Sequence, residues 1–335
     1  MRDHDNGTAA NAVTLSSFEG VGFAALGVLC FSVSLPATRL ALASFGPLTV
    51  SASRAVIAAI FAGLWLLRSG APKPAKADLG PLALVASGVV LGFPVLSSLA
   101  LGHLSATHSA VIFSVTPALT AAFGALLARE RPSARFWVAS LVATLTVCGA
   151  SLARTHAGPT RADALLLVAV VLVSMGYALG ATLSRRLTGP AVISWALIVA
   201  LPVSLPLSVV ALALEPHRPV TTSAALGLAY VSIVSMLLGF FAWYRGLATF
   251  GVAKASQLQL AQGPLAALWS FVLLGESISR ANVLVFFVVI VCALVAVRSR
   301  VRVLLPAVRA DRREVATVQP TPHAATAASR CIDGP

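Results

Sequence analysis

The feature that most constrains this chain is an internal repeat of a helix-length apolar segment. The first copy, Ala106 to Glu130, reads ATHSAVIFSVTPALTAAFGALLARE, and the second, Ala253 to Glu276, reads AKASQLQLAQGPLAALWSFVLLGE. In both copies a proline follows the first alanine by eleven residues, and a glutamate closes the run. Two copies offset by 147 residues in a chain of 335 predict that the whole protein is a duplicated unit.

Composition places the duplicated unit in a membrane. Apolar residues make up 58% of the chain and charged residues only 10%, far from the roughly 25% charged residues of soluble domains. Ten apolar runs are each long enough for a bilayer core of about 30 Å. They cover about 18–43, 48–67, 79–101, 105–128, 135–153, 163–184, 191–214, 223–246, 253–274 and 279–297.

The expected fold is an all-α polytopic membrane protein with ten transmembrane helices. Residues 18–153 would form the first five-helix repeat and residues 163–297 the second. Because each repeat has an odd number of spans, the second enters the membrane in the opposite orientation, which makes the repeats inverted. Residues 1–17 are expected to form a short disordered tail, and residues 298–335 a basic tail that lies on the membrane surface at its start and is disordered at its end.

The basic residues predict the orientation. With the N-terminus inside, the inner segments hold eighteen Lys and Arg residues and the outer loops hold four. Cytoplasmic loops carry such an excess, so both termini should be cytoplasmic. The formal charge of +13 lies in short clusters between apolar runs, with seven basic residues after residue 297. This distribution indicates topology and binding of the tail to anionic lipid, rather than a nucleic-acid partner.

Acidic residues are confined to tails, loops and helix ends, so no carboxylate lies at the middle of a span. Cation-coupled carriers commonly place an Asp or Glu there. The candidate proton site is therefore His108, since histidine titrates near neutral pH; the alternative is a histidine hydrogen-bonded within the bundle. Its counterpart in the second repeat is Ala255, so the symmetry offers it no partner. We expect facilitated movement of solute, or weak coupling.

Three further charges lie at helix ends. Glu130 and Glu276 would lie at opposite membrane faces if the repeats are inverted, so they cannot form one catalytic pair. We expect them to fix the helix end and the following turn, with a salt bridge in a gate as the alternative. Arg54, early in the second span, is expected to reach the interface or to pair with a carboxylate or backbone carbonyls.

Polar residues inside the spans predict a cavity. At 100° per residue, Ser256, Gln259 and Gln262 share one face of the ninth span, and carriers with inverted repeats bind solute near the midplane between the repeats. Interhelical hydrogen bonding is the alternative. The repeat maps three positions of the fourth span onto this face: Ser109, Ile112 and Thr116. Further cavity candidates are Ser174, Tyr177, Ser235, Phe240, Trp243 and Tyr244, although the aromatics from 240 to 244 could equally form an interfacial belt.

Four prolines are expected to bend or interrupt the spans, because proline removes a helical hydrogen bond. They are Pro36, Pro94, Pro117 and Pro264. The four cysteines show no CxxC or Cys/His spacing, so neither a disulfide framework nor a metal site is expected. No cofactor is expected.

With these features together, the sequence resembles the drug/metabolite transporter superfamily, specifically its EamA-type ten-span members. The resemblance covers about residues 20–298. It rests on the position of Arg54, the segments ARERPSARFW and LLGESISRAN, and the five-plus-five layout. It implies two inverted five-helix repeats around a central cavity, in a protein that moves small metabolites across the bacterial inner membrane. The first copy has Arg129 where the family's usual ending, seen in Gly275, has glycine.

The expected function is secondary transport of a small organic metabolite, amino acid-like or related, by alternating access, with export as the expected direction. A multidrug or lipid-like solute exporter is the alternative within transport. A membrane-embedded enzyme would need clustered His, Asp and Glu or a nucleophile in a loop, and the sequence has neither, so no enzyme is expected. A scaffold that transports nothing is the third class, and it would not need Gln or His facing inward. The sequence leaves the oligomeric state open.

Overall fold

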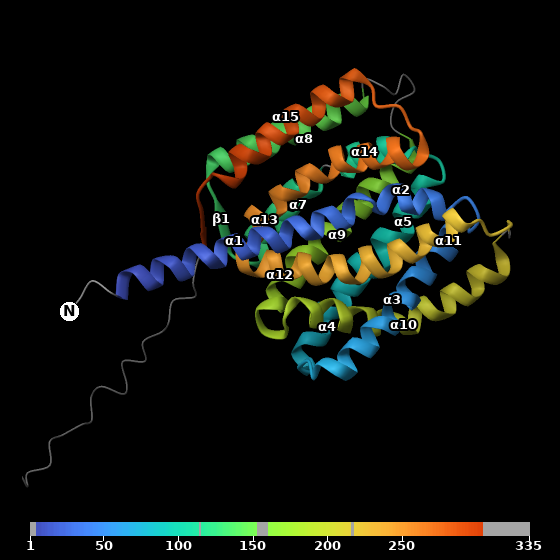
Figure 1. The fold of residues 1–335 in the computed structure, drawn as a ribbon, viewed down its shortest axis with the longest axis horizontal. Coiled ribbons are helices and arrows are strands. Elements are labelled where there is room, and N and C mark those ends of the chain that lie inside the picture. Colours follow the sequence, from blue (N-terminus) through green and yellow to red (C-terminus); the bar gives the residue numbers. More distant parts are fainter. Residues whose placement is uncertain (1–4, 114, 153–159, 216–217, 304–335) are drawn as a thin grey trace, which may run out of the picture. The chain divides into compact units, whose positions relative to one another are not determined.

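The computed structural model describes residues 5–113, 115–152, 160–215 and 218–303. Up to residue 303 the chain forms one compact unit. In the described part this unit is a bundle of helices with one short two-stranded ribbon (Figure 1). It is an all-α polytopic membrane protein, as the sequence predicts.

The first half begins with a helix that is longer than expected. α1 starts at Asp5, within the segment for which the sequence predicts a disordered tail. The helices of this half are α1 (Asp5–Ser32), α2 (Ser34–Ala41), α3 (Pro47–Ser69), α4 (Lys76–Val85), the π-helix η1 (Ala86–Gly92), α5 (Phe93–Leu101), α6 (Ala106–Phe113), α7 (Thr116–Leu127) and α8 (Ala134–Leu152).

The second half repeats this order, except that its first span, α9, has no break like the one between α1 and α2. Its helices are α9 (Arg161–Leu187), α10 (Gly189–Leu214), α11 (Thr222–Ala229), the π-helix η2 (Tyr230–Gly239), α12 (Phe240–Phe250), α13 (Val252–Leu258), the 3₁₀-helix η3 (Gln259–Ala261), α14 (Gln262–Leu274) and α15 (Arg280–Val297). The two π-helices end at glycines 147 residues apart, Gly92 and Gly239, which is the offset of the sequence repeat.

Seven helical segments in the described part are long and apolar enough to cross a membrane. The other three predicted spans coincide with α6–α7, α8 and α13–α14, where the helices are shorter or interrupted. The count of ten spans therefore stays a prediction.

The helices pack in pairs that join one half of the chain to the other. α3 packs on α10, α1 on α12, α5 on α9, α7 on α13, α6 on α14 and α8 on α15. Figure 1 shows the last pair side by side. Four of these pairs, α3 with α10, α7 with α13, α6 with α14 and α8 with α15, join equivalent spans of the two repeats. The other two, α1 with α12 and α5 with α9, are the same contact seen from each repeat, which is the arrangement expected of two inverted repeats.

Each of the four prolines lies just after an interruption of its helix. Pro36 follows the break at Val33, Pro94 follows η1, Pro117 opens α7 and Pro264 follows η3. Since proline has no N–H, the carbonyl four residues earlier loses its helical partner. For Pro117 this is the Phe113 carbonyl, which accepts a hydrogen bond from the Thr116 hydroxyl at 2.5 Å.

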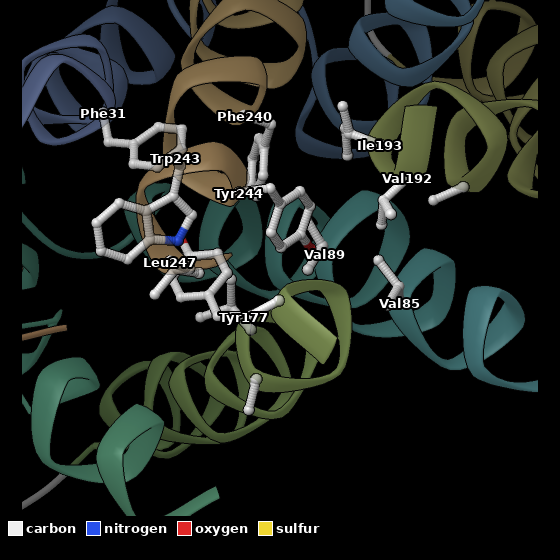
Figure 2. Close-up of a cluster of buried hydrophobic side chains, with 14 of the residues drawn as sticks. Phe31, Val85, Val89, Tyr177, Val192, Ile193, Phe240, Trp243, Tyr244 and Leu247 are labelled. Carbon is white, nitrogen blue, oxygen red and sulfur yellow. The ribbon is translucent and has the colours of Figure 1, made fainter. Parts of the chain in front are cut away.

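An aromatic cluster packs α1, α9 and α12 together. It consists of Phe31, Tyr177, Phe240, Trp243 and Tyr244, with neighbouring ring centroids 4.8 to 6.4 Å apart (Figure 2). The Tyr244 hydroxyl donates to the Gly176 carbonyl at 3.1 Å. Trp243 and Tyr244 are fully buried, so the aromatics of α12 belong to the core and not to an interfacial belt.

A short ribbon joins the connection between α7 and α8 to the start of the C-terminal tail. β1 (Glu130–Pro132) pairs antiparallel with β2 (Val301–Val303), and Glu130 lies opposite Val303. The sequence predicts a loop and a tail at these positions, because three residues are too few to show strand periodicity. The predicted tail beyond residue 303 lies outside the described residues.

Candidate solute site

A small pocket lies inside the bundle, where the two halves meet. Its volume is about 20 Å³, roughly the space of one water molecule. Its apolar lining is Phe31, Leu35, Val89, Phe93, Phe113, Met236 and Phe240, and its polar lining is Ser34, Arg54, Tyr177, Ser235 and Gln262. In this state the pocket is too small for an organic solute, so the residues around it would have to move apart for one to bind.

Arg54 supplies the positive charge in the lining of this pocket. It lies on α3 and is only 3% exposed. One Nη atom donates to the Ser235 hydroxyl at 3.4 Å, and that hydroxyl lies 2.7 Å from the hydroxyl of Ser34. The Nε atom has no hydrogen-bond partner, and the guanidinium forms no ion pair, within the part of the chain that the structure describes. This placement differs from the expected reach to the interface or structural pair.

A buried guanidinium without a carboxylate is expensive, since removing a charge from water costs several kcal/mol unless it is paired. Charged residues inside membrane proteins usually mark a substrate path or relay for that reason. An anionic group entering the pocket would offset the cost, and a carboxylate fits the donors of arginine in two parallel hydrogen bonds. The site is therefore suited to an organic anion or zwitterion.

Two glutamines extend this polar centre. Gln262 lines the pocket, and its amide nitrogen donates to the Phe31 carbonyl at 3.4 Å. Gln259 is 2% exposed and lies beside Tyr177. Within the described chain, the side-chain oxygen of Gln262 and both amide atoms of Gln259 are buried without a hydrogen bond of good geometry. Such groups cost about 1–3 kcal/mol each, so they are available to a ligand.

The structure brings Tyr177, Ser235, Phe240 and Gln262 onto one pocket, with Gln259 next to them. The other predicted cavity residues are buried elsewhere among the helices. The Ser174 hydroxyl donates to the Thr116 carbonyl at 3.3 Å, and that of Ser256 to the Ala253 carbonyl at 2.8 Å. Ser109 and Trp243 are fully buried away from the pocket lining.

His108 lies at a helix end and not at this pocket. Its Nε2 is 2.8 Å from Oδ1 of Asp163, and the two side chains are 18% and 15% exposed. Asp163 also accepts from the backbone N–H of Thr160 and so caps α9. This contact agrees with the alternative given for His108, a histidine hydrogen-bonded within the bundle, and the partner comes from a helix that the repeat does not pair with it.

Glu130 caps a helix of the other repeat. Its two carboxylate oxygens accept from the backbone N–H groups of Val252 and Ala253, at 2.8 and 2.7 Å. Helix starts have unpaired N–H groups and a positive end, so a carboxylate is favoured there. We expected Glu130 to fix the end of its own helix. Glu276, its counterpart, follows Gly275, whose φ of 67° ends α14.

Glu215, in the second repeat, caps a helix of the first repeat in the same way. From the end of α10 in the second repeat, its oxygens accept from the N–H groups of Leu48 and Thr49 at the start of α3, at 3.0 and 2.8 Å. Glu215 and Ser34 were not among the residues predicted from the sequence. A glutamate closing an apolar run, and a hydroxyl two residues before a span-breaking proline, were the signals that could have found them.

Two halves of paired helices around a buried pocket that holds an arginine are an architecture typical of membrane transporters. The EamA-like transporter family matches residues 18–152 and 160–298. The chain belongs to the EamA-like transporter family, and it is a transporter and not an enzyme.

Two relatives are named as transporters, and one solved structure shares the fold. The chain is 45% identical over 273 residues to the uncharacterized transporter YdeK of Bacillus subtilis (strain 168), covering 82% of this chain and 95% of the relative. It is 25% identical over 251 residues to a probable terminal-alkyne amino-acid exporter of Streptantibioticus cattleyicolor, covering 75% and 84%. A crystal structure with 16% identity superposes with a TM-score of 0.67, covering 83% and 97% of the chains, and shows the same fold.

Proposed function

We propose that this transporter exports a small organic solute with a carboxylate group, amino acid-like or related, across the bacterial inner membrane. The observation that supports this proposal is the position of Arg54. Its buried guanidinium lines the central pocket and forms no ion pair among the described residues. A carboxylate would replace the missing counter-charge, while Tyr177 and the two glutamines would bind the rest of the polar head. The exporter name of one relative supports the direction and the amino-acid class.

Alternating access is the transport mechanism that fits this pocket. In the described state the pocket is closed, since about 20 Å³ holds no amino acid. The pairs of helices from opposite repeats would rock about the centre, so that Arg54 faces one side and then the other. A multidrug or lipid-like solute is the second candidate. It is disfavoured because such solutes need a wide apolar cavity and give a buried arginine no counter-charge.

The test is transport by purified protein in liposomes with a panel of matched solutes. Each set contains an amino acid, its amide and the amine without the carboxylate, with equal carbon chains. We expect movement of the carboxylates and little movement of the amides or amines. Equal rates for all three forms, or transport confined to lipophilic cations, would overturn the proposal in favour of multidrug transport.

A further inference from the structure

A second and larger cavity lies at one end of the bundle. Its volume is about 520 Å³, and it is formed by the connection from α2 to α3, the residue after α5 and the loop before α11, which contributes Arg218. We call it the outer cavity, because the predicted topology places this end outside the cell. It has room for a small metabolite, which the central pocket lacks in this state.

A small apolar cluster, which we call the leucine layer, borders both spaces. Leu35 lines the central pocket and Leu42 lines the outer cavity. Both belong to a small cluster with Leu101, Ala266 and Leu274. The aromatic cluster of α1, α9 and α12 also borders the central pocket, through Phe31, Tyr177 and Phe240. A solute that passes the leucine layer from the central pocket would reach the outer cavity.

Two guanidinium groups face the outer cavity, Arg39 and Arg218. Arg39 donates to the Leu101 carbonyl, which fixes its side chain against the wall. An acidic residue, Glu215, shares an adjoining recess with Arg218. Its two oxygens are occupied by the backbone N–H groups of Leu48 and Thr49, so its charge is directed at the start of α3. The cavity thus presents positive charge to a solute.

We propose that the outer cavity is a second binding site, in which Arg39 and Arg218 receive the carboxylate of the solute after it leaves Arg54. This inference rests on the proposed function and adds a staging site on the exit path. A cavity lined by one sign of charge concentrates ions of the opposite sign. An anion that leaves Arg54 and crosses the leucine layer would reach Arg39 and Arg218. Its charge would then be paired with a guanidinium on both sides of the layer.

The probe is a thiol introduced into the outer cavity by Ala43→Cys, in a chain whose four native cysteines are replaced by serine. Ala43 lines the cavity and is exposed. We compare the labelling rate with an anionic sulfonatoethyl and a cationic trimethylammonium-ethyl methanethiosulfonate, each divided by the rate of the same reagent with free 2-mercaptoethanol, because the cationic reagent is intrinsically the faster of the two. The anionic reagent should be favoured by about threefold or more, the effect of a unit charge at a few ångströms in water. The preference should fall as salt is added.

Matched variants identify the charges responsible. Arg39→Gln with Arg218→Gln should abolish the preference, whereas Arg280→Gln, on another predicted outer loop and outside the cavity lining, should keep it. Pentanoate should slow labelling, and pentylamine, of equal chain length, should not. The inference would be overturned if the two reagents had equal relative labelling rates, or if the preference for the anionic reagent survived the double substitution. It would also be overturned if pentanoate did not slow labelling.

The labelling does not depend on transport, so the two proposals fail separately. If liposomes move no carboxylated solute while the cavity still prefers anions, the proposed function fails and the anion site stands. If carboxylates are transported but the cavity shows no preference, the staging site fails and the proposed function stands.

Discussion

The carboxylate of Glu130 in the first repeat accepts a 2.7 Å hydrogen bond from the backbone N–H of Ala253 in the second. The other oxygen accepts from Val252 at 2.8 Å, and Glu130 is only 2% exposed. Its strand β1 also pairs with β2 at the start of the C-terminal tail. A single side chain thus fixes the start of α13, the helix that leads to Gln259.

Glu130→Ala should destabilise the folded protein by about 2 kcal/mol or more, because it leaves two buried N–H groups without acceptors. Glu130→Gln keeps one acceptor oxygen, so its stability should lie between that of the wild type and that of Glu130→Ala. The measurement is the thermal midpoint in detergent. Glu19→Ala is the matched control, since Glu19 pairs with Arg245 at about half exposure, and such pairs contribute about 0–1 kcal/mol. Equal midpoints for Glu130→Ala and the control would contradict the capping role.

The topology prediction places both termini in the cytoplasm. Reporter fusions after residue 156 should report the outside, and fusions after residue 188 the inside, because basic residues cluster in the predicted inner segments. Thr188 follows the end of α9, next to Arg185 and Arg186 in its last turn. An internal signal at 156 or an external one at 188 would reverse the assignment of the outer cavity.

Gln259 is predicted to face the solute path. Gln259→Cys in a cysteine-free chain should react with a small water-soluble thiol reagent when the transporter cycles, and substrate should protect it. Gln257→Cys is the matched control, because Gln257 is fully buried and its amide oxygen accepts from Ser140 of α8, at 3.4 Å, on another face. Labelling at 257 with none at 259 would show that the opposite face lines the path.

Energy coupling is predicted to be weak or absent. His108 pairs with Asp163 at the end of the bundle and does not line the central pocket, so its proton would not change sides with the solute. An imposed pH gradient should alter the initial rate in liposomes only modestly, and His108→Ala should keep that response. Accumulation against a solute gradient, driven by the pH gradient and lost in His108→Ala, would make His108 the proton carrier.

The sequence could predict the repeat, the fold class and the positions of helix interruptions, because these depend on local patterns. A proline interrupts a helix whatever surrounds it, and Pro94 and Pro264 both follow distorted turns. Periodicity also placed Gln262 on the cavity face. These features need no knowledge of which helices meet.

Contacts between helices could not be predicted in the same way. The sequence around Arg54 would be the same whether a distant helix offered it a carboxylate or, as observed, only the Ser235 hydroxyl. Trp243 has the same sequence context in a core as in an interfacial belt, and only its packing on α1 and α9 distinguishes the two. The pairing of His108 with Asp163 joins helices that the repeat does not relate, so symmetry was a misleading guide there.

The most direct test of the account is equilibrium binding of the best carboxylated solute, and of its amide, to the wild type, Arg54→Gln and Arg54→Lys. Arg68→Gln is the control, at the exposed end of the same helix. A hydrogen bond to a charged group contributes about 1.5–3 kcal/mol. Arg54→Gln should therefore weaken binding of the carboxylate by about tenfold to a hundredfold, Arg54→Lys should weaken it less, and neither should change the weak binding of the amide. Equal losses for carboxylate and amide, or no loss in Arg54→Gln, would contradict the claim that Arg54 binds the solute's carboxylate.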